Sequence, residues 1–174
     1  MLNAHPVALA LQCDVVVENF RPDVKFRLGI DYESLKKDNP GLVYASISGF
    51  GQTGPYAGRP GYDFLIQGMA GLMSLTGEPD SQGGSPVKVG VAVTDLLTGL
   101  YAANAIQGAL LERNQSSLGQ YIDLALLDVQ VAALANQASN YLIGGEIPQR
   151  LGNAHPNIVP YQAFSTADGH IILA

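Results

Sequence analysis

Two apolar runs joined by one helical segment constrain the fold of this chain more than any other feature. Residues 14–19 are rich in valine and lack polar alternation, which is typical of a short strand buried on both faces. A helix is expected at 31–38 with Asp31 as its cap, and residues 39–41 (Asn-Pro-Gly) end it before a second strand at 42–48. Strands joined in this way run parallel, so the sequence predicts an α/β fold with a parallel sheet.

The carboxyl ends of these two strands are the expected place for a binding site, because ligands of open parallel sheets lie beyond that edge. The first strand ends at Asn19-Phe20, and the second runs into a glycine-rich loop at 49–55. Basic residues follow the first strand closely, and a small polyanion could bind among them: Arg21, Lys25 and Arg27. The alternative is that they are solvated residues at a helix start.

The later part of the chain is predicted to continue with helices and one more strand. Helices are expected at 62–75, 95–113 and 126–143, the last largely buried, and a strand at 119–124. Only two or three strands of the parallel sheet are therefore visible. From this we expect the sequence to be a piece of a longer chain.

The last thirty residues change in character. Three prolines mark residues 148–160 as a linker. Residues 161–164 and 170–173 then flank a turn that contains Asp168-Gly169, which predicts a β-hairpin.

Charge and composition narrow the possible partners. The 174 residues carry a net charge of -6 and have a pI near 4.8, which argues against nucleic acid because phosphate backbones need a basic face. Polar residues interrupt the two most apolar stretches, so no membrane partner is expected. The single cysteine, Cys13, cannot form an intramolecular disulfide, which fits a reducing, cytoplasmic location. The histidines His5, His155 and His170 are isolated, and no metal site is expected.

Asp95 is the strongest candidate for chemistry. It lies where a stretch rich in glycine and proline, 77–90, gives way to a long apolar helical pattern, so it falls in the first turn of a helix. Backbone N–H groups there lack helical partners and the helix dipole favours negative charge, which keeps the carboxylate ionised and available as a nucleophile. The alternative is that Thr94 or Asp95 merely caps the helix.

The glycine-rich loop does not support a dinucleotide site. Gly49, Gly51 and Gly54 match the spacing of the dinucleotide fingerprint and follow a strand. Pro55 and Pro60, however, prevent the helix whose N-terminus would hold a pyrophosphate. No P-loop lysine or nucleophile elbow is present, so serine and cysteine nucleophiles lack an evident base.

Five motifs, in this order, resemble the class III CoA-transferase family. They are Glu18-Asn19-Phe20-Arg21-Pro22, Leu28-Gly29, Ser48-Gly49-Phe50-Gly51-Gln52-Thr53-Gly54-Pro55-Tyr56, Gly61-Tyr62-Asp63, and Asp95 within T-D-x-x-T-G. The resemblance covers residues 14–174. It implies that acyl-CoA and a carboxylic acid are the substrates, with no permanently bound cofactor.

The resemblance also implies an architecture. The expected subunit has a Rossmann-like large domain and a smaller second domain, and two ring-shaped chains interlock as a homodimer. Residues 1–146 would be part of the large domain, with the CoA site and the catalytic aspartate, and residues 147–174 would be the linker and the first hairpin of the small domain. The chain would lack the family's N-terminal strand and helix and its C-terminal glycine-rich loop, and would be inactive alone.

Site roles follow from the resemblance position by position. Asp95 matches the catalytic aspartate, which would attack the donor thioester and then carry CoA as an aspartyl thioester. Asn19, Phe20, Arg27 and Leu28 match positions that contact CoA, and Tyr62 matches a tyrosine near the acyl group. The basic cluster of Arg21, Lys25 and Arg27 is then expected to hold the CoA phosphates, and Arg59 is a further candidate contact. The family's basic residue before the tyrosine falls on Pro60 here, one position from Arg59.

Two alternatives to CoA transfer stay open from the sequence. Racemases of the same family carry a histidine as base at the position of Tyr62, and a phenol with a reference pKa of about 10 is a poor base at neutral pH, which favours transfer. The chain could instead be an inactive CoA-binding module. Residues 150–161 resemble members that act on small dicarboxylic acids such as succinate and glutarate.

Overall fold

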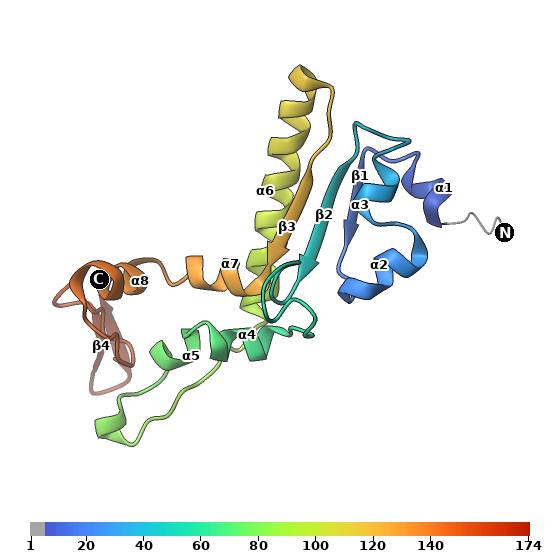
Figure 1. Ribbon diagram of the computed structural model, residues 1–174. Helices are drawn as coiled ribbons and strands as arrows, with labels where there is room; N and C mark the ends of the chain where they lie inside the picture. Colours follow the sequence, from blue (N-terminus) through green and yellow to red (C-terminus); the bar gives the residue numbers. More distant parts are fainter. Residues whose placement is uncertain (1–5) are drawn as a thin grey trace.

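A parallel three-stranded sheet forms the centre of the molecule. The computed structural model describes residues 6–174, so His5 lies outside the described part. The strands are β1 (Val15–Glu18), β2 (Val43–Ser48) and β3 (Tyr121–Ala125), in the order β1-β2-β3 with both pairs parallel (Figure 1). The predicted α/β fold with a parallel sheet is confirmed.

Helices surround this sheet unevenly. The longest, α6 (Val93–Ser116), contacts β2 and β3 along one face of the sheet (Figure 1). The others are α1 (Pro6–Ala10), α2 (Pro22–Leu28), α3 (Tyr32–Leu35), α4 (Asp63–Met69), α5 (Leu72–Leu75), α7 (Leu126–Ala132) and α8 (Ala135–Gly144), with a 3-10 turn η1 (Asp80–Gln82).

Three helical segments differ from the sequence prediction. The residues after Pro22 form α2, because proline fits the first position of a helix, where its missing N–H is not needed. The single helix expected at 62–75 is broken at Gly71, whose φ of 91° is left-handed. The helix expected at 126–143 is likewise two helices, with a positive φ at Ala135. The Asp31 cap is confirmed, since its side chain accepts a hydrogen bond from the backbone N of Ser34.

Two buried clusters hold the helices to the sheet. The first joins α1, α3 and β2 through Ala10, Ile30, Leu35, Leu42 and Tyr44. Burial raises the pKa of the Tyr44 phenol, and its ring stacks on that of Tyr121 with 5.8 Å between centroids. The second cluster consists of Ile66, Ala70 and Leu126, and it packs α4 against the start of α7. This second cluster places α4 directly beside the carboxyl ends of the strands.

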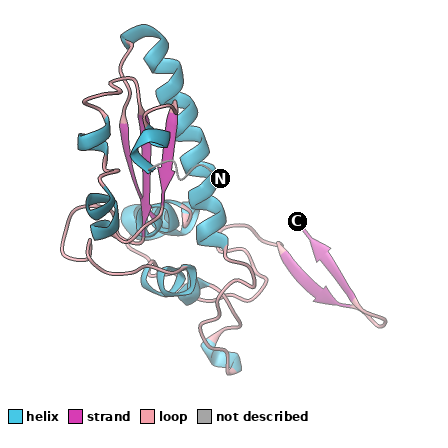
Figure 2. Cartoon of the chain, turned by 90° about the vertical axis from the view of Figure 1, so that its right-hand side faces the viewer, coloured by secondary structure: helices cyan, strands magenta, loops and turns pink. Residues whose placement is uncertain are grey.

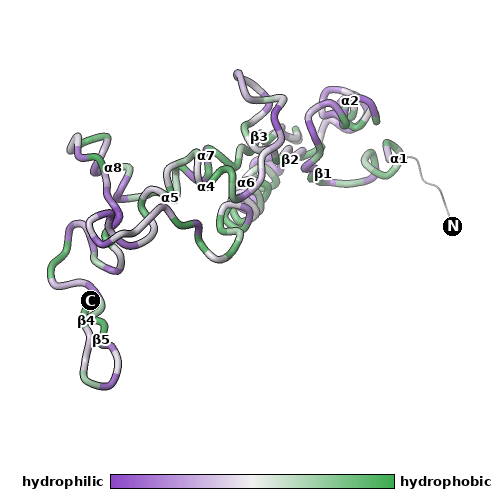
Figure 3. Tube along the Cα trace, turned by 90° about the horizontal axis from the view of Figure 1, so that it is seen from below, coloured by the Kyte–Doolittle hydropathy of each residue, from purple (hydrophilic) through white to green (hydrophobic). Residues whose placement is uncertain are grey.

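The chain from α8 onward lies away from the sheet (Figure 1). The hairpin strands β4 (Gln162–Ser165) and β5 (His170–Leu173) pair antiparallel, which confirms the predicted hairpin, and they project from the body (Figures 1 and 2). Leu142 and Ile143 of α8 are 77% and 88% exposed, so the expectation of a largely buried helix is wrong for α8. Figure 3 shows hydrophilic and hydrophobic stretches alternating along α8 and the hairpin. No helix within residues 6–174 is long and apolar enough to cross a membrane.

Candidate active site

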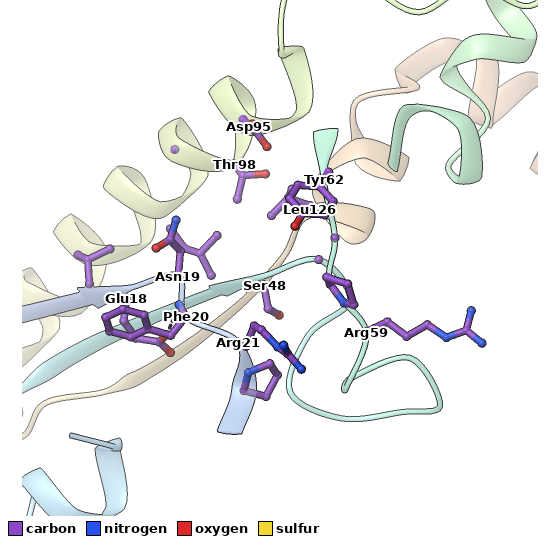
Figure 4. A pocket seen from close by; sticks show the side chains of 17 residues that line it. Glu18, Asn19, Phe20, Arg21, Ser48, Arg59, Tyr62, Asp95, Thr98 and Leu126 are labelled. Carbon is purple, nitrogen blue, oxygen red and sulfur yellow. Dashed lines mark hydrogen bonds between the residues drawn. The ribbon is translucent and has the colours of Figure 1, made fainter. Parts of the chain in front are cut away.

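A cavity of about 580 Å³ opens at the carboxyl ends of β1 and β2, where the strand topology predicts a ligand site. Six of the predicted site residues line it: Asn19, Phe20, Arg21, Arg59, Tyr62 and Asp95. Figure 4 shows the first three rising from the end of β1, while Asp95 and Thr98 extend from α6 and Tyr62 lies near Leu126. The fold therefore gathers residues from five separate stretches of the chain around one space.

Asp95 lies in the first turn of α6 and is exposed to this cavity. The helix begins at Val93, and its N-cap residue, Ala92, has no capping side chain. Capping by Thr94 or Asp95 is thus wrong, because the acceptor comes from another helix: Asp63 Oδ1 accepts the backbone N–H of Thr94 at 2.8 Å. With the cap supplied by Asp63, the Asp95 carboxylate remains available to a ligand.

A buried polar network holds this turn of α6 in place. Gln67 donates from Nε2 to Asp63 Oδ2 at 2.7 Å and accepts from the backbone N of Val89 at 2.9 Å. Thr94 donates from Oγ1 to Gln130 Oε1 of α7 at 2.6 Å. Gln67, Thr94 and Gln130 are fully buried, so their hydrogen bonds are shielded from water. Sequence reasoning missed Gln67 and Gln130, because their contacts with Val89 and Thr94 join residues that are 22 and 36 positions apart.

The environment of Asp95 changes its acidity. Burial of the carboxyl group, and secondly the negative charge of Asp63, raise the pKa of Asp95 above its usual value. A carboxyl group with a raised pKa is, in its ionised form, a stronger base than an ordinary aspartate. Asp95 therefore combines exposure to the cavity with increased nucleophilic character.

The start of the glycine loop lies against the segment that precedes Tyr62. A Cβ built on Gly49 would lie 2.4 Å from the Cα of Gly61, so the two backbones meet where no side chain fits. The loop is also tied to β3, because the backbone N of Gln52 donates to Asp123 Oδ2 at 2.9 Å. The hydrogen bond between Gln52 and Asp123 fixes the glycine loop, and the loop packs against Gly61. Together these contacts set the position of the segment that leads into Tyr62 and α4.

Lys25 does not line the cavity. Its side chain is 4% exposed, and Nζ donates to Ser46 Oγ at 2.9 Å and to Gln52 Oε1 at 2.6 Å, with Glu18 Oε1 at 3.3 Å. An ammonium group enclosed in this way cannot reach a phosphate in the cavity. The expectation that Lys25 binds phosphate is therefore wrong for this structure.

The other basic residues are exposed. Arg27 and Leu28 lie on the outer surface of α2 and do not line the cavity, so their contacts to CoA stay predictions. The Arg59 guanidinium stacks over the Tyr56 ring at 4.3 Å and extends away from the cavity centre (Figure 4). Arg21 has only a weak, exposed contact with Asp23 at 3.9 Å. Arg21 and Arg59 can therefore meet a ligand at the rim without losing a strong ion pair.

Comparison with known proteins identifies the family. The model of CoA-transferase family III matches residues 4–174, and the chain belongs to this family. The chain is 60% identical over 166 residues to succinate–glutarate CoA-transferase of Agrobacterium fabrum, with 95% of this chain and 41% of the relative covered. It is 47% identical over 165 residues to human succinyl-CoA:glutarate CoA-transferase, with 95% of this chain and 37% of the relative covered.

A solved structure shows the same fold. The crystal structure of a CAIB/BAIF family protein from Brucella suis superimposes with a TM-score of 0.86 at 57% sequence identity, over 95% of this chain and 43% of that one. The chain thus spans about two fifths of the length of the relatives that it matches. The resemblance noted from the motifs is confirmed.

Proposed function

We propose that the protein is a CoA-transferase that moves CoA from an acyl-CoA donor to a carboxylic acid through a thioester on Asp95. The observation that carries this proposal is the exposed Asp95 carboxylate on the first turn of α6, facing a cavity whose rim is Asn19, Phe20 and Arg21. The substrates are acyl-CoA and a free acid, and the reaction needs no permanently bound cofactor.

The proposed reaction has two symmetrical halves. The Asp95 carboxylate attacks the thioester carbonyl of the donor, forms a mixed anhydride and releases CoA as thiolate. The thiolate then attacks the Asp95 carbonyl, which gives aspartyl-CoA and frees the donor acid. The acceptor carboxylate attacks this thioester, and the released thiolate attacks the acyl carbonyl of the new anhydride. Acyl-CoA leaves and Asp95 is a carboxylate again.

The helix start supports these steps electrostatically. The dipole of α6, whose positive end lies at this first turn, favours negative charge at Asp95 and on oxyanions formed beside it. Arg21 and Arg59 at the rim are proposed to meet the phosphates of CoA, as Arg27 is from the surface of α2. This distribution explains how a chain with a net charge of -6 binds a polyanion.

Dicarboxylic acids are the proposed acyl and acceptor groups, since the relatives named above are CoA-transferases of succinate and glutarate. We expect the intact protein, meaning this chain with any flanking sequence encoded with it, to form glutaryl-CoA from succinyl-CoA and glutarate. A panel of acids analysed by chromatography of the CoA esters measures this. Absence of transfer to every acid, with exchange of the α-proton of a 2-methylacyl-CoA instead, would show a racemase.

The acid side of the pH profile tests the electrostatic role of Asp63. Protonation of Asp95 removes the nucleophile, so kcat/KM is expected to fall as the pH falls through its pKa, which Asp63 helps to raise. Asp63→Asn removes this charge and should move the acid limb of kcat/KM to lower pH. Gln67→Met breaks the hydrogen bond to Asp63 but keeps the charge, so it should cause no such downward shift. An acid limb that is unchanged or moves upward in Asp63→Asn contradicts the assignment.

The whole protein is further proposed to be a cytoplasmic homodimer. The family resemblance implies interlocked chains, and the single cysteine fits a reducing compartment. Exposed apolar residues such as Leu142 and Ile143 on α8 are consistent with further covering protein in the assembled state.

A further inference from the structure

Lys25 is a charged side chain enclosed beside the cavity, with 4% of its side chain exposed. Its Nζ is surrounded by oxygens from four parts of the fold: Glu18 of β1, Ser46 of β2, Gln52 of the glycine loop and Tyr121 of β3. The Tyr121 hydroxyl is 3.4 Å away, and the other three oxygens lie between 2.6 and 3.3 Å. An ammonium has three protons, so all of its donors are used within the protein.

Glu18 extends this contact to the cavity rim. Its side chain is 3% exposed; Oε1 faces Lys25 and accepts from the Ser46 hydroxyl, while Oε2 accepts the backbone N–H of Phe20 at 2.9 Å. On the other side of Lys25, Gln52 is held to β3 by Asp123. One continuous chain of hydrogen bonds therefore runs from the Phe20 backbone, through Glu18 and Lys25, to the glycine loop.

We propose that Lys25 and Glu18 are a buried positioning pair, which fixes the Phe20 rim relative to the glycine loop and so sets the affinity for CoA. Lys25 does not line the cavity, and Glu18, which does, uses both of its carboxylate oxygens in contacts within the protein. The inference rests on the proposed function, because CoA is taken as the occupant of the cavity. Lys25, which the sequence pattern predicts to be an exposed phosphate ligand, is thereby assigned a positioning role in a buried ion pair.

The burial of both charges supports this role over ligand binding. A buried pair is costly to break, because removal of either partner leaves an uncompensated charge. Rotation of Lys25 into the cavity would break its contacts with Ser46 and Gln52 and leave Glu18 without its cation. The pair therefore acts on CoA through the backbone of Phe20 and through the loop, and not through Nζ.

Glu18→Gln distinguishes a phosphate-binding Lys25 from a positioning Lys25, because the two roles predict opposite changes in the KM for acyl-CoA. If Lys25 is a phosphate ligand, loss of the neighbouring negative charge frees it and lowers the KM for acyl-CoA. If the pair positions the rim, Glu18→Gln and Lys25→Met each raise that KM by about tenfold, while kcat changes by less than about threefold. Steady-state kinetics of the intact protein with succinyl-CoA measures both constants. A lower KM in Glu18→Gln overturns the proposal.

A double variant and a matched control sharpen this test. Glu18→Gln combined with Lys25→Met removes both charges and leaves neither one buried alone, so its KM is expected to lie closer to that of the wild type than either single variant. Lys37→Met removes an exposed lysine beyond α3 and should leave KM unchanged. A double variant whose defect is the product of the two single defects contradicts coupling between Lys25 and Glu18.

Hydrogen exchange tests the link independently of catalysis. In Lys25→Met the amides of Phe20 and Gln52 are expected to exchange at least about tenfold faster, because Glu18, the acceptor of the Phe20 amide, loses its cation and the Gln52 side chain loses its donor. The Tyr44 amide in β2, which donates to the Gln120 carbonyl at 2.8 Å, should keep its rate. Unchanged exchange at Phe20 and Gln52 overturns the positioning role.

Calorimetry with CoA on the wild-type protein tests the proposed function separately. If CoA does not bind, the proposed function is overturned. The exchange rates of Phe20 and Gln52 still show whether Lys25 connects the rim to the glycine loop.

Discussion

Asp95→Asn is expected to lower the rate of CoA transfer by at least about a thousandfold, because an amide cannot attack a thioester or carry CoA. Initial rates of glutaryl-CoA formation by the intact protein measure this loss. The shape of the side chain is kept, and the Thr94 amide remains capped by Asp63, so the start of α6 should be preserved. The loss therefore reports on chemistry and not on the fold.

Stability measurements provide the control for Asp95. Its pKa is raised in the folded state, so the folded protein holds the proton more tightly than the unfolded chain, and ionisation at neutral pH works against folding. Asp95→Asn removes this effect and should leave the melting temperature unchanged or slightly higher at pH 7. Asp38→Asn, an exposed carboxylate beyond α3, is the matched variant that should retain activity. Activity near the wild-type rate in Asp95→Asn would refute the nucleophile.

Gly61→Ala is expected to give the largest structural defect of any single methyl group added near the site. The new Cβ would lie 2.3 Å from the Cα of Gly49, which is closer than real Cβ contacts, so one of the two backbones must move. We expect a loss of about 3 kcal/mol in the free energy of unfolding, as for a severe overpacking change. Urea titration of the intact protein measures it. Transfer should fall as well, since Tyr62 follows Gly61 directly.

Gly58→Ala is the matched control in the same loop. A Cβ on Gly58 meets no atom within 4 Å, and the residue is not among the glycines with positive φ, so neither contact nor backbone strain is expected. Its stability and activity should match the wild type. If Gly61→Ala also behaves like the wild type, the close approach of the two loops is not needed for the site.

The sheet and the location of the site could be predicted from the sequence because both depend on local patterns. The apolar run at 42–48 marks β2 to within one residue, and the carboxyl ends of parallel strands indicate where a ligand lies. Asp95 was recognisable for a similar reason, since the change from a glycine-rich stretch to a helical pattern places it in a first helical turn.

The interactions that complete the site could not be predicted in this way. The cap on the Thr94 amide comes from Asp63, which is 31 positions earlier in the chain, so no local signal marks it. Lys25 shares a short basic cluster with Arg21 and Arg27, yet its position on α2 turns it toward Ser46 and Tyr121, 21 and 96 positions away. A cluster in sequence does not show which of its members is buried.

The covalent role of Asp95 is tested most directly by following oxygen from the acceptor acid. In the proposed reaction one carboxylate oxygen of the acceptor remains on Asp95 when the new acyl-CoA leaves. The intact protein is therefore incubated with succinyl-CoA and glutarate labelled with oxygen-18, and the peptide that contains Asp95 is analysed by mass spectrometry. The account predicts heavy oxygen in the Asp95 side chain after turnover. Formation of glutaryl-CoA without label in Asp95 would contradict it.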